Sequence, residues 1–123
     1  MPMITVNTLP LDAGVDKGSI LKKLVSALAA AIDAPEEKIF AGWNTYDSFV
    51  DSMDAKTNFS SSSHPPIVKI DLFEGREETK KDKALNAITA TIKTELDFAG
   101  NPFVYMTDIM SGHINTGGKI IKK

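Results

Sequence analysis

Several residue types and patterns are missing from this sequence, and each absence excludes a class of protein. There is no cysteine, which excludes a disulfide framework, a thiolate nucleophile and a cysteine-bound metal. No apolar stretch approaches the roughly 18 residues of a membrane-spanning helix, and no basic and then apolar leader opens the chain. We therefore expect a cytoplasmic protein without a membrane partner.

Positive charge is also not in excess. Acidic side chains number 16 against 14 lysines and arginines, for a formal net charge of −2. Nucleic-acid-binding surfaces usually need a basic excess, so no nucleic-acid partner is expected. The two histidines, His64 and His113, share no metal-ligand spacing with an acidic cluster, and no metal site is predicted. The 123 residues suit one compact domain.

What the chain does contain is an internal repeat. Residues 2–7 align with residues 66–71, and both are short β-branched segments led by a proline, as expected of strands. At the same offset, and without a gap, residues 39–44 align with residues 103–108 as a second strand. Between the strands, apolar positions at helical spacing coincide: Leu21 with Leu85, Leu24 with Ile88, Leu28 with Ile92 and Ile32 with Leu96. The alternative is a coincidence between two ordinary βα units.

Each copy therefore has the order strand, helix, strand. The helices are predicted over residues 16–33, ended by Pro35, and over residues 77–97, closed by Gly100 and Pro102. A helical crossover makes the strands of each unit parallel. The fold class is thus α+β: tandem β-α-β repeats in a four-stranded sheet with both helices on one face. We expect the other face to be apolar and bare, and so to pack against other subunits.

The predicted organisation is a single domain with four parts. Repeat one covers residues 2–45, an insertion covers 46–65, repeat two covers 66–109 and a tail covers 110–123. The polar insertion is either a solvated linker or a loop whose aromatic residues cover a site near the strand ends. The tail is turn-forming and includes a possible short strand at residues 119–121, for which a neighbouring subunit's sheet edge would be a natural partner.

Two residues are candidates for chemistry. Removal of the initiating methionine would leave Pro2 with a secondary amine, and an α-amino group with a pKa of about 7.7–8.0 is a usable base at neutral pH. The alternative is that Met1-Pro2 is an ordinary chain start and that Pro2 has no catalytic role. Arg76 is the single arginine and follows the first strand of repeat two; its guanidinium can hold a carboxylate by two parallel hydrogen bonds. Its alternative is a solvated ion pair with Glu78 or Asp82.

These residues lie in segments that resemble a known family. Residues 66–81, in which a proline-led strand runs into Glu74-Gly75-Arg76 and then an acidic, lysine-bearing helix start, resemble the opening of 4-oxalocrotonate tautomerase. Residues 1–8 resemble the opening of macrophage migration inhibitory factor, a two-repeat relative. The chain is thus similar, outside residues 46–65, to a two-repeat bacterial member of the tautomerase superfamily.

The resemblance implies a homotrimer and a cofactor-independent keto–enol tautomerase, an isomerase acting on 2-oxo or 2-hydroxy-alkenoic acids. Pro2 would be the general base, and Arg76 would bind the carboxylate of a small-molecule substrate. Pro66 cannot be a base, because it follows Pro65 and its nitrogen is a tertiary amide.

The chain also departs from the family pattern. Asp12 stands where an arginine would be in repeat one, and Ala34 replaces a lysine of the inhibitory-factor branch. That branch's tyrosine and asparagine on the last strand correspond to Phe103 and Tyr105, which are candidates for substrate binding. Lys38 or Lys119 is a candidate for the missing charge. Fewer cations favour a monoacid or an aryl-enolpyruvate over a dicarboxylate. The alternative function is a non-enzymatic trimeric binding protein, which retention of Met1 would favour.

Overall fold

A computed structural model describes residues 2–50, 64–97 and 100–122. Repeat one contains β1 (Met3–Thr8), α1 (Lys17–Ile32), the 3-10 turn η1 (Glu36–Lys38) and β2 (Phe40–Thr45). Repeat two contains β3 (Ile67–Phe73), α2 (Glu78–Glu95) and β4 (Phe103–Ile109), and the tail contains β5 (Asn115–Thr116) and β6 (Lys119–Ile120). Most of the predicted insertion, residues 51–63, lies outside the described residues.

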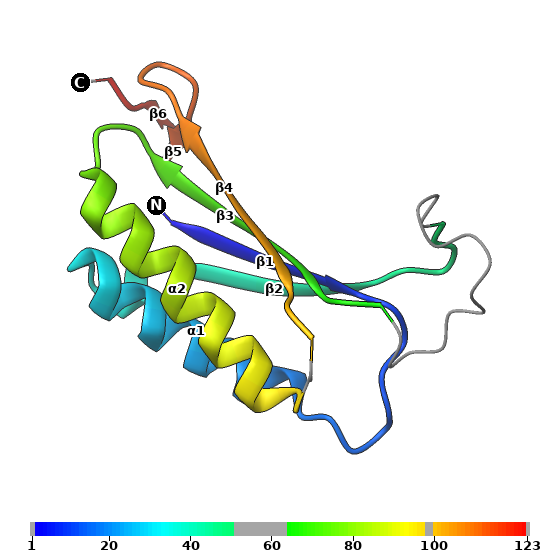
Figure 1. Cartoon of the computed structure of the whole chain (residues 1–123). Helices are drawn as coiled ribbons and strands as arrows, with labels where there is room; N and C mark the ends of the chain where they lie inside the picture. Colours follow the sequence, from blue (N-terminus) through cyan, green and yellow to red (C-terminus); the bar gives the residue numbers. More distant parts are fainter. Residues whose placement is uncertain (1, 51–63, 98–99, 123) are drawn as a thin grey trace.

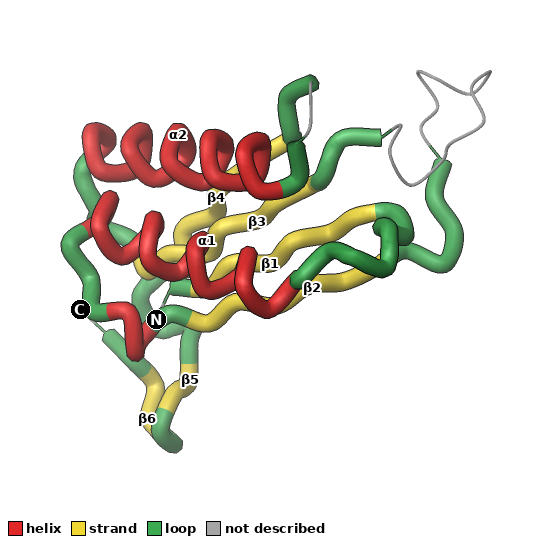
Figure 2. The backbone as a smooth tube through the Cα atoms, turned by 90° about the horizontal axis from the view of Figure 1, so that it is seen from below, coloured by secondary structure: helices red, strands yellow, loops and turns green. Residues whose placement is uncertain are grey.

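The four long strands form one mixed sheet in the order β2-β1-β3-β4. Within each repeat the strands are parallel, β1 with β2 and β3 with β4, and the two repeats join through the antiparallel pair β1–β3. Both helices pack on the same face of this sheet (Figures 1 and 2). The predicted fold class, with tandem β-α-β units and both helices on one face, is confirmed.

Helix α1 forms where its apolar stripe and its end signals agree. Asp16 caps the start, with its Oδ1 accepting the Ser19 amide N–H at 3.0 Å. Asp33 closes the end in the left-handed conformation, at φ 55°, and Pro35 follows. The helix therefore lies almost where the sequence predicted it.

Helix α2 presents the equivalent stripe to the same core. Its buried residues are Ala84, Ile88 and Ile92, each 64 positions after Ile20, Leu24 and Leu28 of α1. The helix begins at Glu78 and ends at Glu95, slightly inside the predicted range of 77–97. Asp97 follows with a φ of 49°, a turn that directs the chain back toward the sheet.

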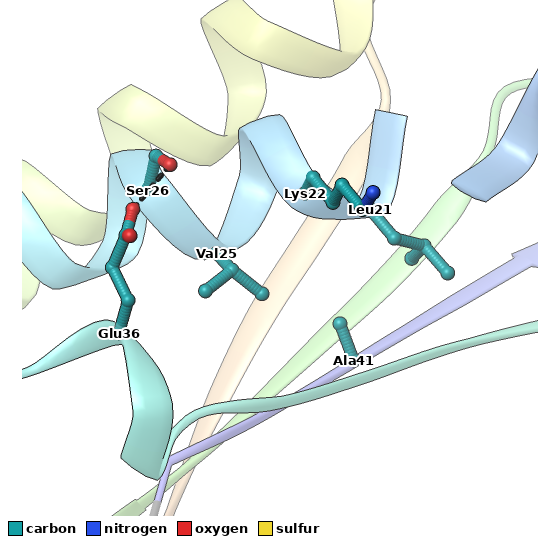
Figure 3. Close-up of a pocket in the computed structure, with 6 residues that line it drawn as sticks. All are labelled: Leu21, Lys22, Val25, Ser26, Glu36 and Ala41. Atoms are coloured by element: carbon teal, nitrogen blue, oxygen red, sulfur yellow. Dashed lines mark hydrogen bonds between the residues drawn. The ribbon is translucent and has the colours of Figure 1, made fainter. Parts of the chain in front are cut away.

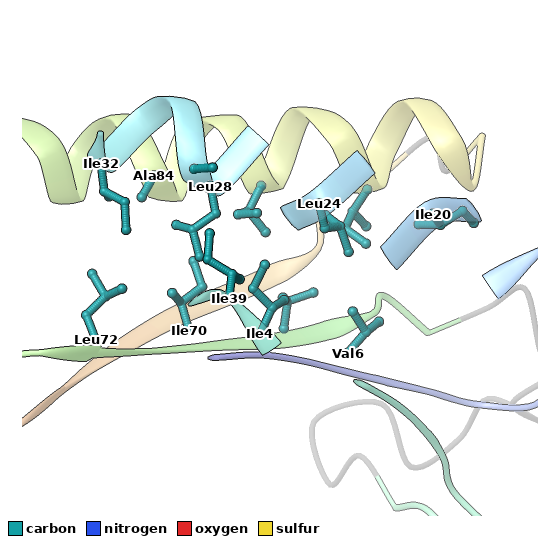
Figure 4. Close-up of a cluster of buried hydrophobic side chains, with 14 residues drawn as sticks. Ile4, Val6, Ile20, Leu24, Leu28, Ile32, Ile39, Ile70, Leu72 and Ala84 are labelled. Carbon is teal, nitrogen blue, oxygen red and sulfur yellow. The ribbon is translucent and has the colours of Figure 1, made fainter. Parts of the chain in front are cut away.

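The core lies between the two helices and the sheet (Figure 4). The strands contribute alternate residues, as period-2 geometry requires. Ten large side chains are almost completely buried there: Ile4, Val6, Leu24, Leu28, Ile32, Val68, Ile70, Leu72, Ile88 and Ile92. Because these side chains come from both repeats, the two units share one core.

The alignment of the second strands needs a correction. The Pro2 carbonyl accepts the Phe40 N–H at 3.0 Å, and the Pro66 carbonyl accepts the Phe103 N–H at 2.9 Å. Phe40 and Phe103 are therefore equivalent, whereas the gapless alignment matched Ile39 with Phe103. Between helix and strand, repeat two is one residue shorter than repeat one. The apolar pattern missed this because both registers place hydrophobic residues on strands.

The sheet face opposite the helices is uncovered in the single chain, as predicted, but it is only partly apolar. The side chains of Met3, Phe40 and Phe103 are exposed at its margins. Its central strands carry polar groups instead, with Lys69 Nζ 3.5 Å from Asp71 Oδ1 and Asp71 accepting a hydrogen bond from Thr107. A partner on this face must therefore match polar as well as apolar groups.

The tail forms a small hairpin in which β5 pairs antiparallel with β6. The short strand predicted near residues 119–121 is thus present, and its partner in the described chain is β5. No helix among the described residues is both long enough and apolar enough to cross a membrane.

Candidate functional site

Pro2 lies immediately before β1 and is buried. A proline is tolerated here because the first position of a strand need not donate to the sheet. Its carbonyl accepts the Phe40 N–H, so the β1–β2 ladder fixes the backbone of Pro2 at the edge where both parallel strands begin. Pro66 has the same place in repeat two, but Pro65 precedes it.

Arg76 lies at the same end of the sheet as Pro2. Because β3 runs antiparallel to β1, Met3 is opposite Asp71, and β3 ends beside the start of β1. Gly75 then turns the chain with a φ of 98°, a value that favours glycine, and Arg76 follows before α2 begins. The sequence placed Arg76 in the repeat without the candidate base; the antiparallel pairing brings the two ends together within one chain.

The guanidinium of Arg76 is only partly satisfied. Its Nη1 donates to the carbonyl of Ile32, in the last turn of α1, at 3.4 Å. Its Nε is buried and has no hydrogen-bond partner among the described residues. The alternative ion pair with Glu78 or Asp82 is not formed in the described part of the chain, where Glu78 instead lies 3.8 Å from Lys81. The guanidinium therefore keeps one buried hydrogen-bond donor that has no partner among the described residues.

Lys38 and the C-terminal tail lie at the same end of the sheet as Pro2 and Arg76. Lys38 is exposed in η1, two residues before Phe40, whose N–H binds the Pro2 carbonyl. The tail is attached here by Glu74: its N–H donates to the Ile109 carbonyl at 2.9 Å, and its Oε2 accepts the Ser111 N–H at 2.5 Å. The chain's start, β5 and β6 consequently lie together in Figure 1. This end combines the proline, two cationic side chains and an ordered hairpin.

Phe103 and Tyr105 lie away from the end of the sheet that holds Pro2 and Arg76. Phe103 begins β4 opposite Ile67, which itself pairs with Asn7 near the end of β1, so Phe103 is at the sheet end remote from Pro2. Tyr105 is two residues farther along the same strand. Both are exposed, by 61% and 38%, and their ring centroids are 5.7 Å apart. A single chain thus separates the predicted substrate-binding residues into two groups, one at each end of the sheet.

The sequence did not single out Phe49 and His64, which lie beside the second group. They flank residues 51–63, and their rings meet edge to face with centroids 4.4 Å apart. Together with Phe103 and Tyr105 they line a hollow of about 710 Å³. The sequence did contain one relevant signal, the aromatic residues of the insertion. The interpretation of the insertion as a loop that covers a site rested on these residues.

A second hollow, of about 470 Å³, lies on the outer side of α1 between that helix, η1 and β2 (Figure 3). Leu21, Val25 and Ala41 supply its apolar lining, and Ser26 donates a hydrogen bond to Glu36 across one side. None of the predicted site residues lines it. We therefore treat it as a feature of the helix–strand packing.

Comparison with known proteins identifies the fold. No family model matches the chain, and no curated protein matches it at a significant level. Among solved structures, an asymmetric trimer of fused 4-OT matches with a TM-score of 0.81 and 21% identity, over 96% of this chain and 94% of that one. A member of the cis-3-chloroacrylic acid dehalogenase family matches with a TM-score of 0.78 and 18% identity, over 97% and 82% of the respective chains.

A macrophage migration inhibitory factor-like protein from Entamoeba histolytica also matches, with a TM-score of 0.73 and 10% identity over 98% of each chain. All three similar structures are tautomerase-superfamily proteins. The chain therefore has the tautomerase-superfamily fold, as the sequence resemblance predicted. At these identities the similarity defines the fold, while the chemistry depends on the residues described above.

Proposed function

We propose that this protein is a cofactor-independent keto–enol tautomerase acting on 2-oxo or 2-hydroxy-alkenoic acids. Pro2, freed by removal of Met1, is the general base, and Arg76 holds the substrate carboxylate. The observation that carries the proposal is that the start of β1 and the end of β3, which leads to Arg76, lie at the same end of the sheet, and that the buried Nε of Arg76 has no partner among the described residues. An unpaired buried donor is costly, and a bound carboxylate would satisfy it.

The reaction needs only a base and an anion anchor. The uncharged proline nitrogen takes the proton of the enol hydroxyl, and that C–O bond becomes a carbonyl. The proton is then delivered to the carbon at the far end of the former double bond, so the product is an isomer of the substrate. Lys38, at the same end of the sheet, adds positive charge that favours the uncharged amine and the anionic substrate.

We further propose that the working form is a homotrimer of single-domain chains, each with repeats at residues 2–45 and 66–109. Two observations support association: the uncovered sheet face, and the similarity to fused 4-OT trimers. In such an assembly, Phe103 and Tyr105 of one chain could complete the site at Pro2 of another. This arrangement would unite the two groups of residues that a single chain keeps apart.

The test compares Pro2→Ala with Pro66→Ala. We expect Pro2→Ala to slow ketonisation of an aryl-enolpyruvate, followed by ultraviolet absorbance, by about 100-fold or more, because a primary amine that rotates freely replaces the secondary amine held in the proline ring and is a poorly positioned base. Pro66→Ala changes the equivalent proline, whose nitrogen cannot titrate, and should retain activity. Mass spectrometry of the mature protein should show that Met1 is absent.

Equal loss in both variants would indicate a structural effect and would contradict the base role. A retained Met1, or no turnover in any of these proteins, would favour a trimeric binding protein without enzymatic activity. Circular dichroism and sedimentation of both variants serve as folding controls.

A further inference from the structure

Glu74 links the turn between β3 and α2, which carries Arg76, to the C-terminal tail. It is the first residue after β3 and lies two positions before Arg76. Its backbone N–H donates to the Ile109 carbonyl at 2.9 Å, at the end of β4, and its Oε2 accepts the Ser111 N–H at 2.5 Å. Figure 1 shows this turn and the hairpin of the tail at the same end of the molecule. One glutamate therefore holds the segment that leads from β4 into the hairpin through both its main chain and its side chain.

The contacts of Arg76 itself hold the guanidinium only weakly. Its Nη1 donates to the Ile32 carbonyl at 3.4 Å, longer than the usual hydrogen-bond distance of about 2.7–3.2 Å. Its Nε is buried and has no partner among the described residues. The residue before it, Gly75, has a φ of 98° in a region that glycine adopts at little cost. The position of the guanidinium consequently depends on what fixes the turn.

The turn has a second contact, which is weaker than that of Glu74. Lys80 Nζ, in the first turn of α2, lies 3.4 Å from Asp33 Oδ2 at the end of α1. The two side chains are 35% and 78% exposed, and exposed ion pairs contribute little. The contact between Glu74 and Ser111 is partly buried and joins a carboxylate to a backbone N–H, which makes it a charge-assisted hydrogen bond. Glu74 is therefore the stronger anchor of the two.

We propose that Glu74 is a positioning residue for Arg76. By bonding to Ser111, it holds the turn in place and keeps the guanidinium in one orientation before any ligand arrives. A binding group that is already ordered loses less conformational entropy when its ligand binds. The effect on substrate binding rests on the proposed function, in which Arg76 holds the carboxylate, whereas the ordering of Arg76 in the unbound protein does not.

The first test observes the guanidinium directly, without a ligand. Arg76 is the single arginine of the sequence, so its Nε–H gives one arginine side-chain signal in a proton–nitrogen NMR spectrum of the full-length protein. In Glu74→Ala we expect hydrogen exchange at this Nε–H to become at least about fivefold faster, because the turn opens more often. Glu74→Gln keeps an oxygen that can accept the Ser111 N–H, and its exchange should stay within about twofold of the unmodified rate.

Ser111 offers a matched pair of variants on the other side of the bond. The Met110 carbonyl accepts the His113 N–H at 2.9 Å and Gly112 has a φ of 84°, so Ser111 occupies a turn position that favours proline. Ser111→Pro removes the N–H that donates to Glu74 and should speed Nε–H exchange as Glu74→Ala does. Ser111→Ala keeps that N–H and should not. This pair tests the proposal even if Glu74→Ala fails to fold.

The second test measures carboxylate binding by titration calorimetry. The probe is cinnamate, an unsaturated monocarboxylate without an enol or 2-oxo group to react. Glu74→Ala should bind it at least about threefold more weakly, since the guanidinium is no longer ordered in advance. Removal of a negative charge would by itself strengthen the binding of an anion, so a weaker affinity cannot be a charge effect. Glu77→Ala, which changes an exposed glutamate of the same turn, is the control and should not weaken binding.

A general loss of stability has a different signature from a loss of positioning. It would speed exchange at core amides, such as that of Ile88 in α2, by the same factor as at the Arg76 Nε–H. Exchange that does not change in Glu74→Ala and Ser111→Pro, or that increases equally at Ile88, would overturn the proposal. An equal increase in Glu74→Gln and Glu74→Ala would also overturn it.

These outcomes differ from those that test the proposed function. If Pro2→Ala abolishes turnover but exchange at the Arg76 Nε–H does not respond to Glu74→Ala, the tautomerase function stands and the positioning role is wrong. If exchange responds as expected while the unmodified protein neither binds cinnamate nor turns over an enol acid, Glu74 positions Arg76 in a protein without the tautomerase function.

Discussion

Arg76 makes a structural contact in the fold and, in the proposed function, also binds the substrate carboxylate. Its Nη1 donates to Ile32 in the last turn of α1, where carbonyls lack helical partners and a cation is favourable. The same side chain buries an Nε with no partner among the described residues. The first contact stabilises the fold, whereas the second atom is a cost that a bound carboxylate would remove.

Replacing Arg76 by methionine should therefore separate binding from stability. We expect cinnamate binding to weaken by at least about tenfold, because a charge-assisted contact is lost. The free energy of unfolding should change by less than about 1 kcal/mol, since one long hydrogen bond and one unsatisfied donor are removed together. Calorimetry and urea denaturation measure the two quantities.

Arg76→Lys is the companion variant. It keeps the charge but not the planar fork, and intermediate binding is expected. A large loss of stability with unchanged binding would assign Arg76 to the fold alone.

At the scale of elements, Lys81 links helix α2 to β4, a strand at the edge of the sheet. Its Nζ lies 2.9 Å from Asp108 Oδ2 and 3.8 Å from Glu78 Oε1. The hydrogen bond with Asp108 raises the pKa of Lys81 above its ordinary value of 10.5; desolvation opposes this rise, and the negative charges of Asp108 and Glu78 add to it. The contact thus joins a helix to an edge strand that has β3 as its one neighbour among the described strands.

The pH dependence of this contact has a definite sign. Because the pKa is raised on folding, the stabilisation is complete below 10.5 and disappears as the pH rises through the folded-state value. Lys81→Met should therefore lower the urea midpoint slightly at pH 8, and the difference should vanish at strongly alkaline pH.

Lys83→Met, which changes an exposed lysine of the same helix, controls for the general loss of a positive charge. A difference between Lys81→Met and the unmodified protein that persists at alkaline pH would show that the packing of the lysine stem, and not its charge, is responsible.

At the scale of the whole molecule, the predicted site residues lie in two groups at opposite ends of one sheet. This separation leads to a prediction about how chains assemble. Pro2, Lys38 and Arg76 lie at one end, and Phe103 lies at the other. If a site joins both groups between chains, two inactive variants can complement each other.

Mixed trimers of Pro2→Ala and Phe103→Ser chains provide the measurement. After co-refolding in equal amounts, about a quarter of the sites should combine an intact Pro2 with an intact Phe103 from another chain. Ketonisation should return to roughly that fraction of the unmodified rate. No recovery, with trimers confirmed by sedimentation, would contradict a site shared between chains.

Much of the fold could be predicted from the sequence because local signals agree with the tertiary arrangement. Apolar spacing from Leu24 to Leu28 and from Ile88 to Ile92 predicted both helices, and Asp16 and Pro35 bracketed the first. The alignment at Phe103 was wrong by one residue, because hydrophobicity alone does not fix strand register. The open face was expected to be apolar, but Lys69 and Asp71 interrupt it.

The sequence by itself determined the two β-α-β units, the placement of both helices on one sheet face and the candidates Pro2 and Arg76, since these depend on periodicity and residue type. Only the tertiary structure decided which residues meet. Antiparallel pairing of β1 with β3 reverses the second repeat, so Arg76 comes to the end where Pro2 lies and Phe103 goes to the other. The tertiary structure also brings the rings of Phe49 and His64 together from either side of residues 51–63. Strand direction and loop closure are long-range properties, and no local pattern encodes them.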